Sequence, residues 1–158
     1  MRRAPPSLAA TAIGAMLWAA AMAASALANL LLYQWETPAK IWTVTLLFGL
    51  GGLAAFPAAL FFARLATGRR GGETAFSAAF VALIVFTIVI TSACFSLQHR
   101  LYNAESHSLS FSPIWVLEFA LTIVGALAQF VLLGTRLYFP IGFIALFIAG
   151  LWFARLPR

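Results

Sequence analysis

The polar stretch FSLQHRLYNAESHSLSFSP, from Phe95 to Pro113, holds both histidines of the chain and one of its four carboxylates. His99, Glu105 and His107 are residue types that bind Zn²⁺ or Cu²⁺. Their spacing, H-x5-E-x-H, fits no ligand pattern that we can derive, and the surrounding Asn, Ser and Gln are typical of turns. We therefore expect an external connector, with a metal site or a pH-sensing histidine pair as alternatives. Because neither histidine lies within an apolar run, a haem held between membrane helices by two histidines of this chain is excluded.

Glu118 is the only charged residue within an apolar run of the sequence. A carboxylate at the centre of a membrane helix costs about 2.5–3.5 kcal/mol on insertion scales, so such residues often mark proton or cation sites. Glu118 follows Pro113 by only about 7–8 Å of helix, which is shallow. We expect an outer-edge residue that pairs with Arg100 or hydrogen-bonds to Thr and Gln neighbours, with an ion site as the alternative.

Polar residues recur at i, i+4, i+7 and i+11 in two consecutive runs, which places each set on one helical face. The first set is Thr87, Thr91, Cys94 and Gln98, and the second is Glu118, Thr122, Gly125 and Gln129. We expect the two stripes to face each other and to form a polar path. The alternative for the threonines is a hydrogen bond to the backbone of their own helix.

The elements that must position these residues are membrane helices. The chain of 158 residues is 63% hydrophobic and 9% charged, against about 25% charged residues in ordinary soluble domains. Five runs approach the 20 or so apolar residues that a spanning helix needs. They cover residues 8–33, 41–63, 74–97, 113–133 and 137–154. The predicted fold class is all-α: one polytopic membrane bundle of five transmembrane helices, or four if the last run is re-entrant.

Basic residues predict the orientation of these spans. Five spans place six basic residues inside (Arg2, Arg3, Arg64, Arg69, Arg70, Arg136) and four outside (Lys40, Arg100, Arg155, Arg158), whereas four spans give eight to two. We expect the Arg64–Arg70 loop to be cytoplasmic, the His99–His107 loop to be external, and the membrane to be a bacterial inner membrane. The start MRR, the apolar stretch and then SALA resemble a signal peptide, but the run continues through NLLLY, and its length favours an uncleaved helix.

Several function classes find no support in the sequence. The chain has no GxSxG, P-loop or HExxH motif, no CxxC pair, and a single cysteine, Cys94. Its charge of +6 lacks the basic and aromatic footprint of nucleic-acid binding and fits anionic lipid instead. We expect a non-catalytic accessory or structural subunit that packs against other membrane proteins or against copies of itself, and no particular cofactor is indicated. The alternatives are an ion-coupled transporter using Glu118, Thr122 and Gln129, and a metal-handling protein using the histidines.

Overall fold

A computed structural model describes residues 7–33, 37–67, 72–103 and 113–155. The elements are α1 (Leu8–Tyr33), α2 (Pro38–Thr67), α3 (Gly72–Asn103), α4 (Pro113–Leu133), the 3₁₀ segment η2 (Gly134–Tyr138) and α5 (Ile141–Arg155). Apart from Ser7, Thr37, Phe139 and Pro140, the described residues are all helical, as the predicted fold class requires. Three helices are long and apolar enough to cross a membrane, namely α1, α2 and the part of α3 up to Gln98.

The helix ends follow local sequence signals. Ser7 caps α1, because its hydroxyl accepts a hydrogen bond from Ala10 N at 3.1 Å. Pro38 opens α2 at the first helical position, where its missing N–H costs nothing. The helix α3 continues to Asn103 because the segment after Phe95 contains no glycine or proline to stop it. His99 therefore lies on this helix and not in a loop, which corrects the sequence-based prediction.

The helices α1, α2 and α3 pack around small side chains. Ala55, Ala59 and Ala63 on α2 are all at most 1% exposed, and Ala75 and Ala79 on α3 are fully buried. Lipid gives helices no hydrophobic drive to associate, so close backbone approach and buried hydrogen bonds must hold them together. Gly51 marks the closest approach, since a Cβ built on it would lie 2.8 Å from the Cα atom of Thr91.

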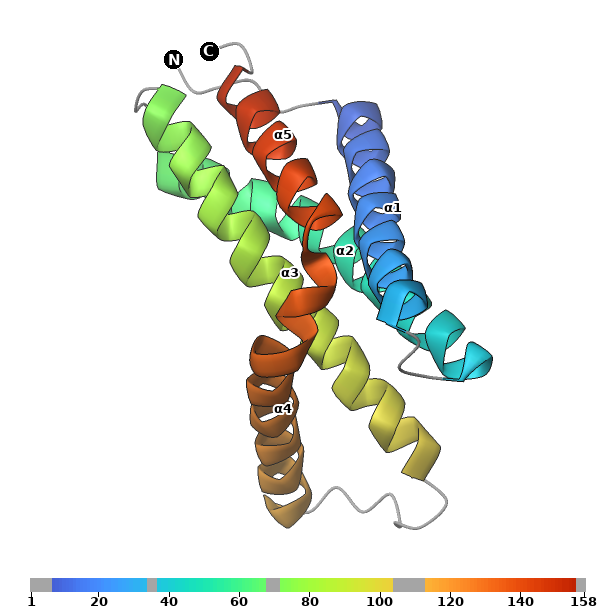
Figure 1. Cartoon of the computed structure of the whole chain (residues 1–158). Helices are drawn as coiled ribbons and strands as arrows, with labels where there is room; N and C mark the ends of the chain where they lie inside the picture. The colour runs from blue at the N-terminus through green and yellow to red at the C-terminus, as the bar shows by residue number, and fades with distance from the viewer. Residues whose placement is uncertain (1–6, 34–36, 68–71, 104–112, 156–158) are drawn as a thin grey trace.

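The helix α5 continues the direction of α4 and does not reverse it. In Figure 1, α4 begins at the end of the bundle where α3 finishes, and α5 ends beside the start of α1 and the end of α2. The segments α4, η2 and α5 thus make a single broken passage from one end of the bundle to the other. The fourth and fifth predicted runs are separate helices, but η2 does not turn the chain back between them, so the predicted opposite directions of a fourth and a fifth span are not seen.

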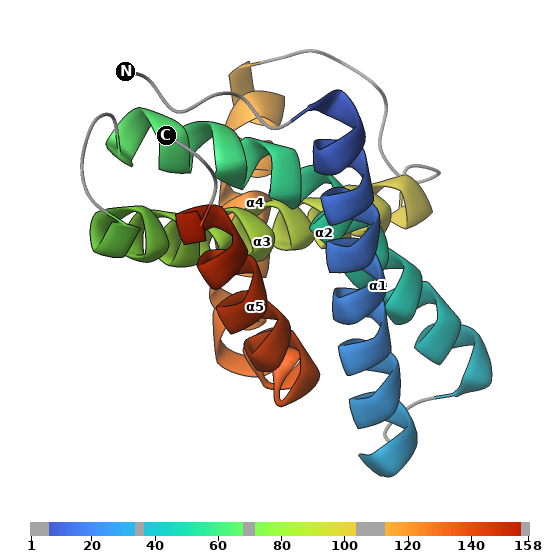
Figure 2. The ribbon, with the colours of Figure 1, turned by 90° about the horizontal axis from the view of Figure 1, so that it is seen from above.

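The helix α4 stands apart from the bundle. Seen from above, α1 and α5 lie on one face of the crossing α2 and α3, whereas α4 passes on the far side of α3 (Figure 2). Its buried anchor is Phe130, near its C-terminal end, which is 7% exposed. The Phe130 ring centroid lies 5.4 Å from that of Phe48 on α2, 5.9 Å from that of Phe95 on α3, and 5.9 Å from that of Tyr138. Among the described side chains, this aromatic cluster attaches the C-terminal end of α4 to α2, α3 and η2.

Candidate functional site

The first two residues of the predicted polar stripe on α3, Thr87 and Thr91, lie inside the bundle. Thr87 is 3% exposed and accepts a hydrogen bond from the indole Nε1 of Trp18 at 3.2 Å. Thr91 is fully buried and accepts one from the Tyr138 hydroxyl at 3.1 Å. Cys94 is half-buried, and Gln98 is exposed. The threonines therefore tie α3 to α1 and η2, and they do not face α4.

A valine in place of Thr87 removes the acceptor of the Trp18 indole while keeping the side-chain shape. We expect the free energy of unfolding in detergent to fall by about 1 kcal/mol, in the range measured for interhelical hydrogen bonds in membranes. A double-mutant cycle of Thr87→Val with Trp18→Phe isolates the bond, because the second substitution should then cost little more. Fully additive losses would show that the bond contributes nothing.

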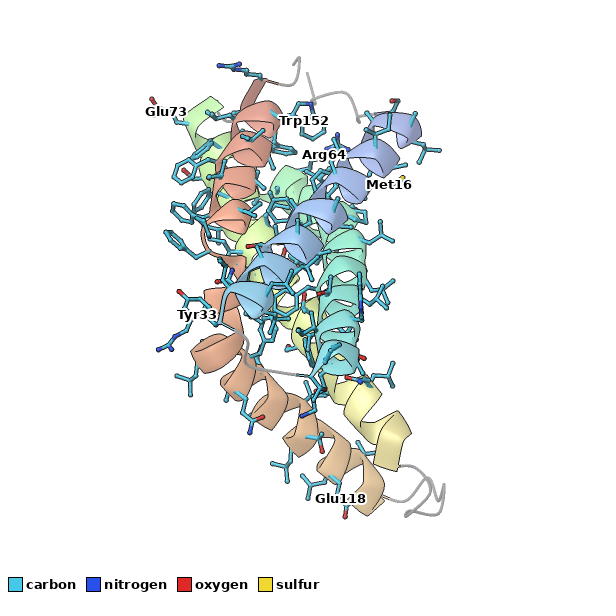
Figure 3. All side chains as sticks on the ribbon, turned by 45° about the vertical axis from the view of Figure 1, so that its right-hand side comes forward. Met16, Tyr33, Arg64, Glu73, Glu118 and Trp152 are labelled. Atoms are coloured by element: carbon cyan, nitrogen blue, oxygen red, sulfur yellow. The ribbon has the colours of Figure 1, made fainter. Side chains whose placement is uncertain are left out.

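The predicted polar stripe on α4 points away from the bundle. Glu118 and Gln129 are exposed, and a Cβ built on Gly125 would meet no other atom within 4 Å. Thr122 donates to the carbonyl of Glu118, one turn back on its own helix, at 2.7 Å. Figure 3 shows Glu118 at the far end of α4, away from the other labelled side chains. The expectation that the two stripes face each other is therefore wrong.

Phe130 explains this orientation of α4. The large aromatic ring enters the cluster with Phe48, Phe95 and Tyr138, and burial of such a ring outweighs the pairing of two polar faces. Successive helical residues project about 100° apart. With Phe130 turned inward, Gln129 and the stripe that leads back to Glu118 lie about a quarter to a third of a turn away from the bundle, where Glu118 and Gln129 are exposed.

The break between α4 and α5 is held by two polar side chains of α1. The amide Nδ2 of Asn29 lies 2.7 Å from the carbonyl oxygen of Phe139 and 3.4 Å from that of Leu137. Ser25 Oγ accepts a hydrogen bond from Gly142 N at 3.4 Å, in the first turn of α5. Interrupted backbone is tolerated at membrane depth only where protein satisfies its polar groups. Asn29 and Ser25 perform that task for backbone groups on both sides of the break.

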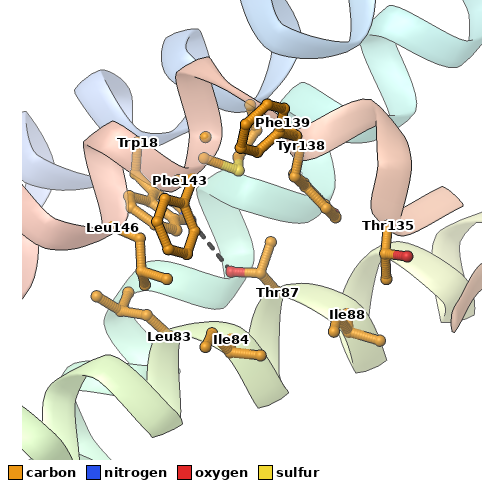
Figure 4. Close-up of a pocket in the computed structure, with 12 residues that line it drawn as sticks. Trp18, Leu83, Ile84, Thr87, Ile88, Thr135, Tyr138, Phe139, Phe143 and Leu146 are labelled. Atoms are coloured by element: carbon orange, nitrogen blue, oxygen red, sulfur yellow. Dashed lines mark hydrogen bonds between the residues drawn. The ribbon is translucent and has the colours of Figure 1, made fainter.

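A cavity of about 260 Å³ opens beside this break, between α1, α3 and α5. Figure 4 shows the Trp18–Thr87 hydrogen bond at one side of it and Tyr138 and Thr135 at another. The Thr135 hydroxyl donates to the carbonyl of Val131 on its own chain segment. The remaining lining is almost wholly apolar, with Leu83 and Leu146 among its members. The cavity therefore has the surface chemistry to hold an apolar group and offers no charged side chain for a hydrophilic substrate.

The side chains of the predicted metal site lie outside the part of the chain that the structure describes. His99 lies on α3, but its side chain falls outside that part, as do Glu105 and His107 altogether. Among the residues that the structure does describe, no group of three His, Cys, Asp or Glu side chains is placed to hold a metal ion. The three residues remain a prediction.

Sequence reasoning missed the residues that organise the interior, namely Trp18, Ser25, Asn29 and Tyr138. The position of Asn29 indicated a structural role, since an asparagine side chain within an apolar run needs a hydrogen-bonding partner. The position of Trp18 gave a similar indication, because a buried indole N–H normally finds an acceptor. Asn29 donates to the Ser25 carbonyl on its own helix at 2.9 Å, but the partners that Trp18 and Asn29 have on other elements are 69 and 110 residues away along the chain, and no local pattern identifies them.

Comparison with protein-family models, with curated proteins and with solved structures finds no match to this chain.

Proposed function

We propose that this chain is a small integral membrane protein that acts without catalysis, as an accessory or structural subunit, and that α4 is the surface by which it packs against another membrane helix. The observation that carries the proposal is the exposure of Glu118, Gly125 and Gln129 on a helix whose other residues, apart from Thr122, are apolar. Polar side chains facing lipid are costly, and they normally face a protein neighbour.

The spacing of these residues supports helix pairing. Glu118, Thr122, Gly125 and Gln129 follow the i, i+4, i+7, i+11 order of a coiled-coil seam. Gly125 allows close backbone approach, and Gln129 offers an amide that hydrogen-bonds across helices. Within the described part of the chain, nothing approaches the Cβ position of Gly125.

The same proposal includes an orientation in a bacterial inner membrane. Three spanning helices and the broken α4–α5 passage make four crossings, which put the start of α1 and the end of α5 on one side. Arg64 near the end of α2 and Arg155 at the end of α5 then belong to that side, and Arg2, Arg3, Arg69, Arg70 and Arg158 adjoin the same helix ends in the sequence, whereas Arg136 lies within the passage, on η2. Lys40 and Arg100 belong to the other side, so the positive-inside rule makes the arginine-rich side cytoplasmic.

The test is co-purification from the native membrane at native abundance. Gly125→Leu fills the seam of α4, and we expect it to lower recovery of a partner, or of a second tagged copy, at least tenfold. Ala120→Leu adds the same side chain to an exposed position on another face of α4 and should leave recovery unchanged. Equal recovery from both variants, or a wild-type protein isolated as a monomer, would exclude α4 as the contact surface.

A second candidate is an oligomeric proton- or ion-coupled carrier. The α4 stripe is exposed in one chain, so any path lined by Glu118, Thr122 and Gln129 would have to form between copies. In that case Glu118→Gln should abolish proton flux into liposomes that contain the oligomer while leaving its mass unchanged. Wild-type flux from the variant, or no flux from the wild type, would rule out this candidate.

A further inference from the structure

A second and larger cleft separates the upper parts of α1 and α5. It has a volume of about 460 Å³ and an almost wholly apolar lining, with Phe56 of α2 at its base. The Phe56 ring centroid lies 6.2 Å from that of Trp18 and 6.3 Å from that of Trp152. Gly14 on α1 and Ala149 on α5 face the cleft, and their small size keeps it open.

The apolar lining suits a hydrocarbon chain. Apolar cavities do not hold water well, because a bound water needs two to four polar partners. An unfilled cleft also forfeits the dispersion contacts of every atom that lines it. At the side of a membrane helix bundle, the molecules that reach such a cleft are lipids, and their acyl chains are flexible enough to fill it.

Two arginines lie near the end of the bundle onto which this cleft opens, where α2 and α5 finish and α1 begins. On α2, Arg64 lies four residues after Leu60 and eight residues after Phe56. It is therefore about 12 Å further along the helix than Phe56. Figure 3 shows Arg64 at the upper end of the bundle, between Trp152 of α5 and Met16 of α1. Arg155 ends α5, one turn beyond Trp152.

Guanidinium groups recognise phosphate through paired N–H donors. Arg64 is half-buried, so its orientation is restricted by the helices around it. A guanidinium has five N–H donors, which leaves donors for a phosphate even where the side chain also contacts protein. The apolar cleft and the arginine end therefore match the two parts of one phospholipid molecule.

We propose that the cleft between α1 and α5 is a binding site for an anionic phospholipid, with one acyl chain over Phe56 between Gly14 and Ala149 and the phosphate at Arg64. A single lipid seated there replaces direct contact between the upper parts of α1 and α5. The site is independent of the α4 surface, because the two lie on different faces of the bundle.

The test is native mass spectrometry of the full chain in mild detergent with added phosphatidylglycerol or phosphatidylcholine of identical acyl chains. We expect the wild type to retain one phosphatidylglycerol at least fivefold more than phosphatidylcholine, since one arginine near the surface contributes about 1 kcal/mol, or about fivefold. Arg64→Gln should reduce this preference to below twofold. Arg136→Gln removes an exposed arginine of η2 and should leave the preference intact.

A larger side chain in the cleft tests whether the acyl chain binds there. Ala149→Leu should lower retention of phosphatidylglycerol at least fivefold, whereas Ala20→Leu on the exposed face of α1 should not. A photoactivatable phosphatidylglycerol on the wild type keeps the test independent of how the variants fold, and it should label peptides of α1 and α5. Equal retention of the two lipids, retention unaffected by Ala149→Leu, or labelling confined to other helices would overturn the proposal. Recovery of a neutral isoprenoid in the cleft would overturn it as well.

Discussion

Asn29→Leu should lower the free energy of unfolding in detergent by about 1–2 kcal/mol. The substitution keeps the side-chain volume but removes the donor that serves the carbonyls of Leu137 and Phe139, at 3.4 and 2.7 Å. The bond to the Leu137 carbonyl is partly buried and the bond to the Phe139 carbonyl is exposed, and a hydrogen bond between membrane helices contributes up to about 1–2 kcal/mol. The loss should be concentrated at the break, so trypsin should cleave after the exposed Arg136 faster than in the wild type.

The control for this prediction is Thr43→Val. Thr43 also sits on a helix near its end, but its hydroxyl bonds to the carbonyl of Ala39 on its own helix, at 3.1 Å. Its loss should change stability by less than about 0.5 kcal/mol, as for most surface substitutions. If Asn29→Leu unfolds at the same temperature as Thr43→Val and is cut after Arg136 at the wild-type rate, then Asn29 does not hold the break.

The elements of this fold could be predicted from the sequence because membrane helices are specified locally. The expected runs at residues 8–33 and 113–133 have the bounds of α1 and α4, and those at 41–63 and 74–97 fall within α2 and α3. Apolar runs, Pro38 and the capping Ser7 are all properties of neighbouring residues. A helix is determined by such neighbours, so a pattern in the chain suffices to locate it.

The arrangement of the elements could not be predicted in the same way. Charge counting left four and five spans open, and no local pattern predicts that α4 and α5 run in one direction or that η2 between them packs against Asn29. The two polar stripes had identical spacing, yet one is buried and the other exposed. What separates them is the aromatic cluster around Phe130, whose members come from three helices and η2. Contacts of this kind link residues far apart in the chain, and an apolar sequence offers many alternative pairings.

Gly51→Ala should destabilise the bundle by about 3 kcal/mol, at the upper end of the range for overpacked sites. The added methyl group would lie 2.8 Å from the Cα of Thr91, and backbone cannot rotate away as a side chain can. The helices α2 and α3 must therefore move apart. That movement also displaces the Thr91 hydroxyl from the Tyr138 hydroxyl, now 3.1 Å away, so η2 should loosen together with the α2–α3 contact.

The variants Gly49→Ala and Gly125→Ala add the same methyl group at two other glycines and serve as controls for Gly51→Ala. At Gly49 the nearest atoms to a Cβ are at 3.5 and 3.8 Å, which is ordinary contact, and at Gly125 nothing lies within 4 Å. Both positions should gain up to about 1 kcal/mol, because alanine is the better helix former. Thermal unfolding of the three variants should therefore rank Gly51→Ala below the wild type and the other two at or above it. A Gly51→Ala protein as stable as Gly49→Ala would mean that α2 and α3 are further apart at Thr91 than the structure places them. In that case Thr91 could not link α2, α3 and η2 at a single point.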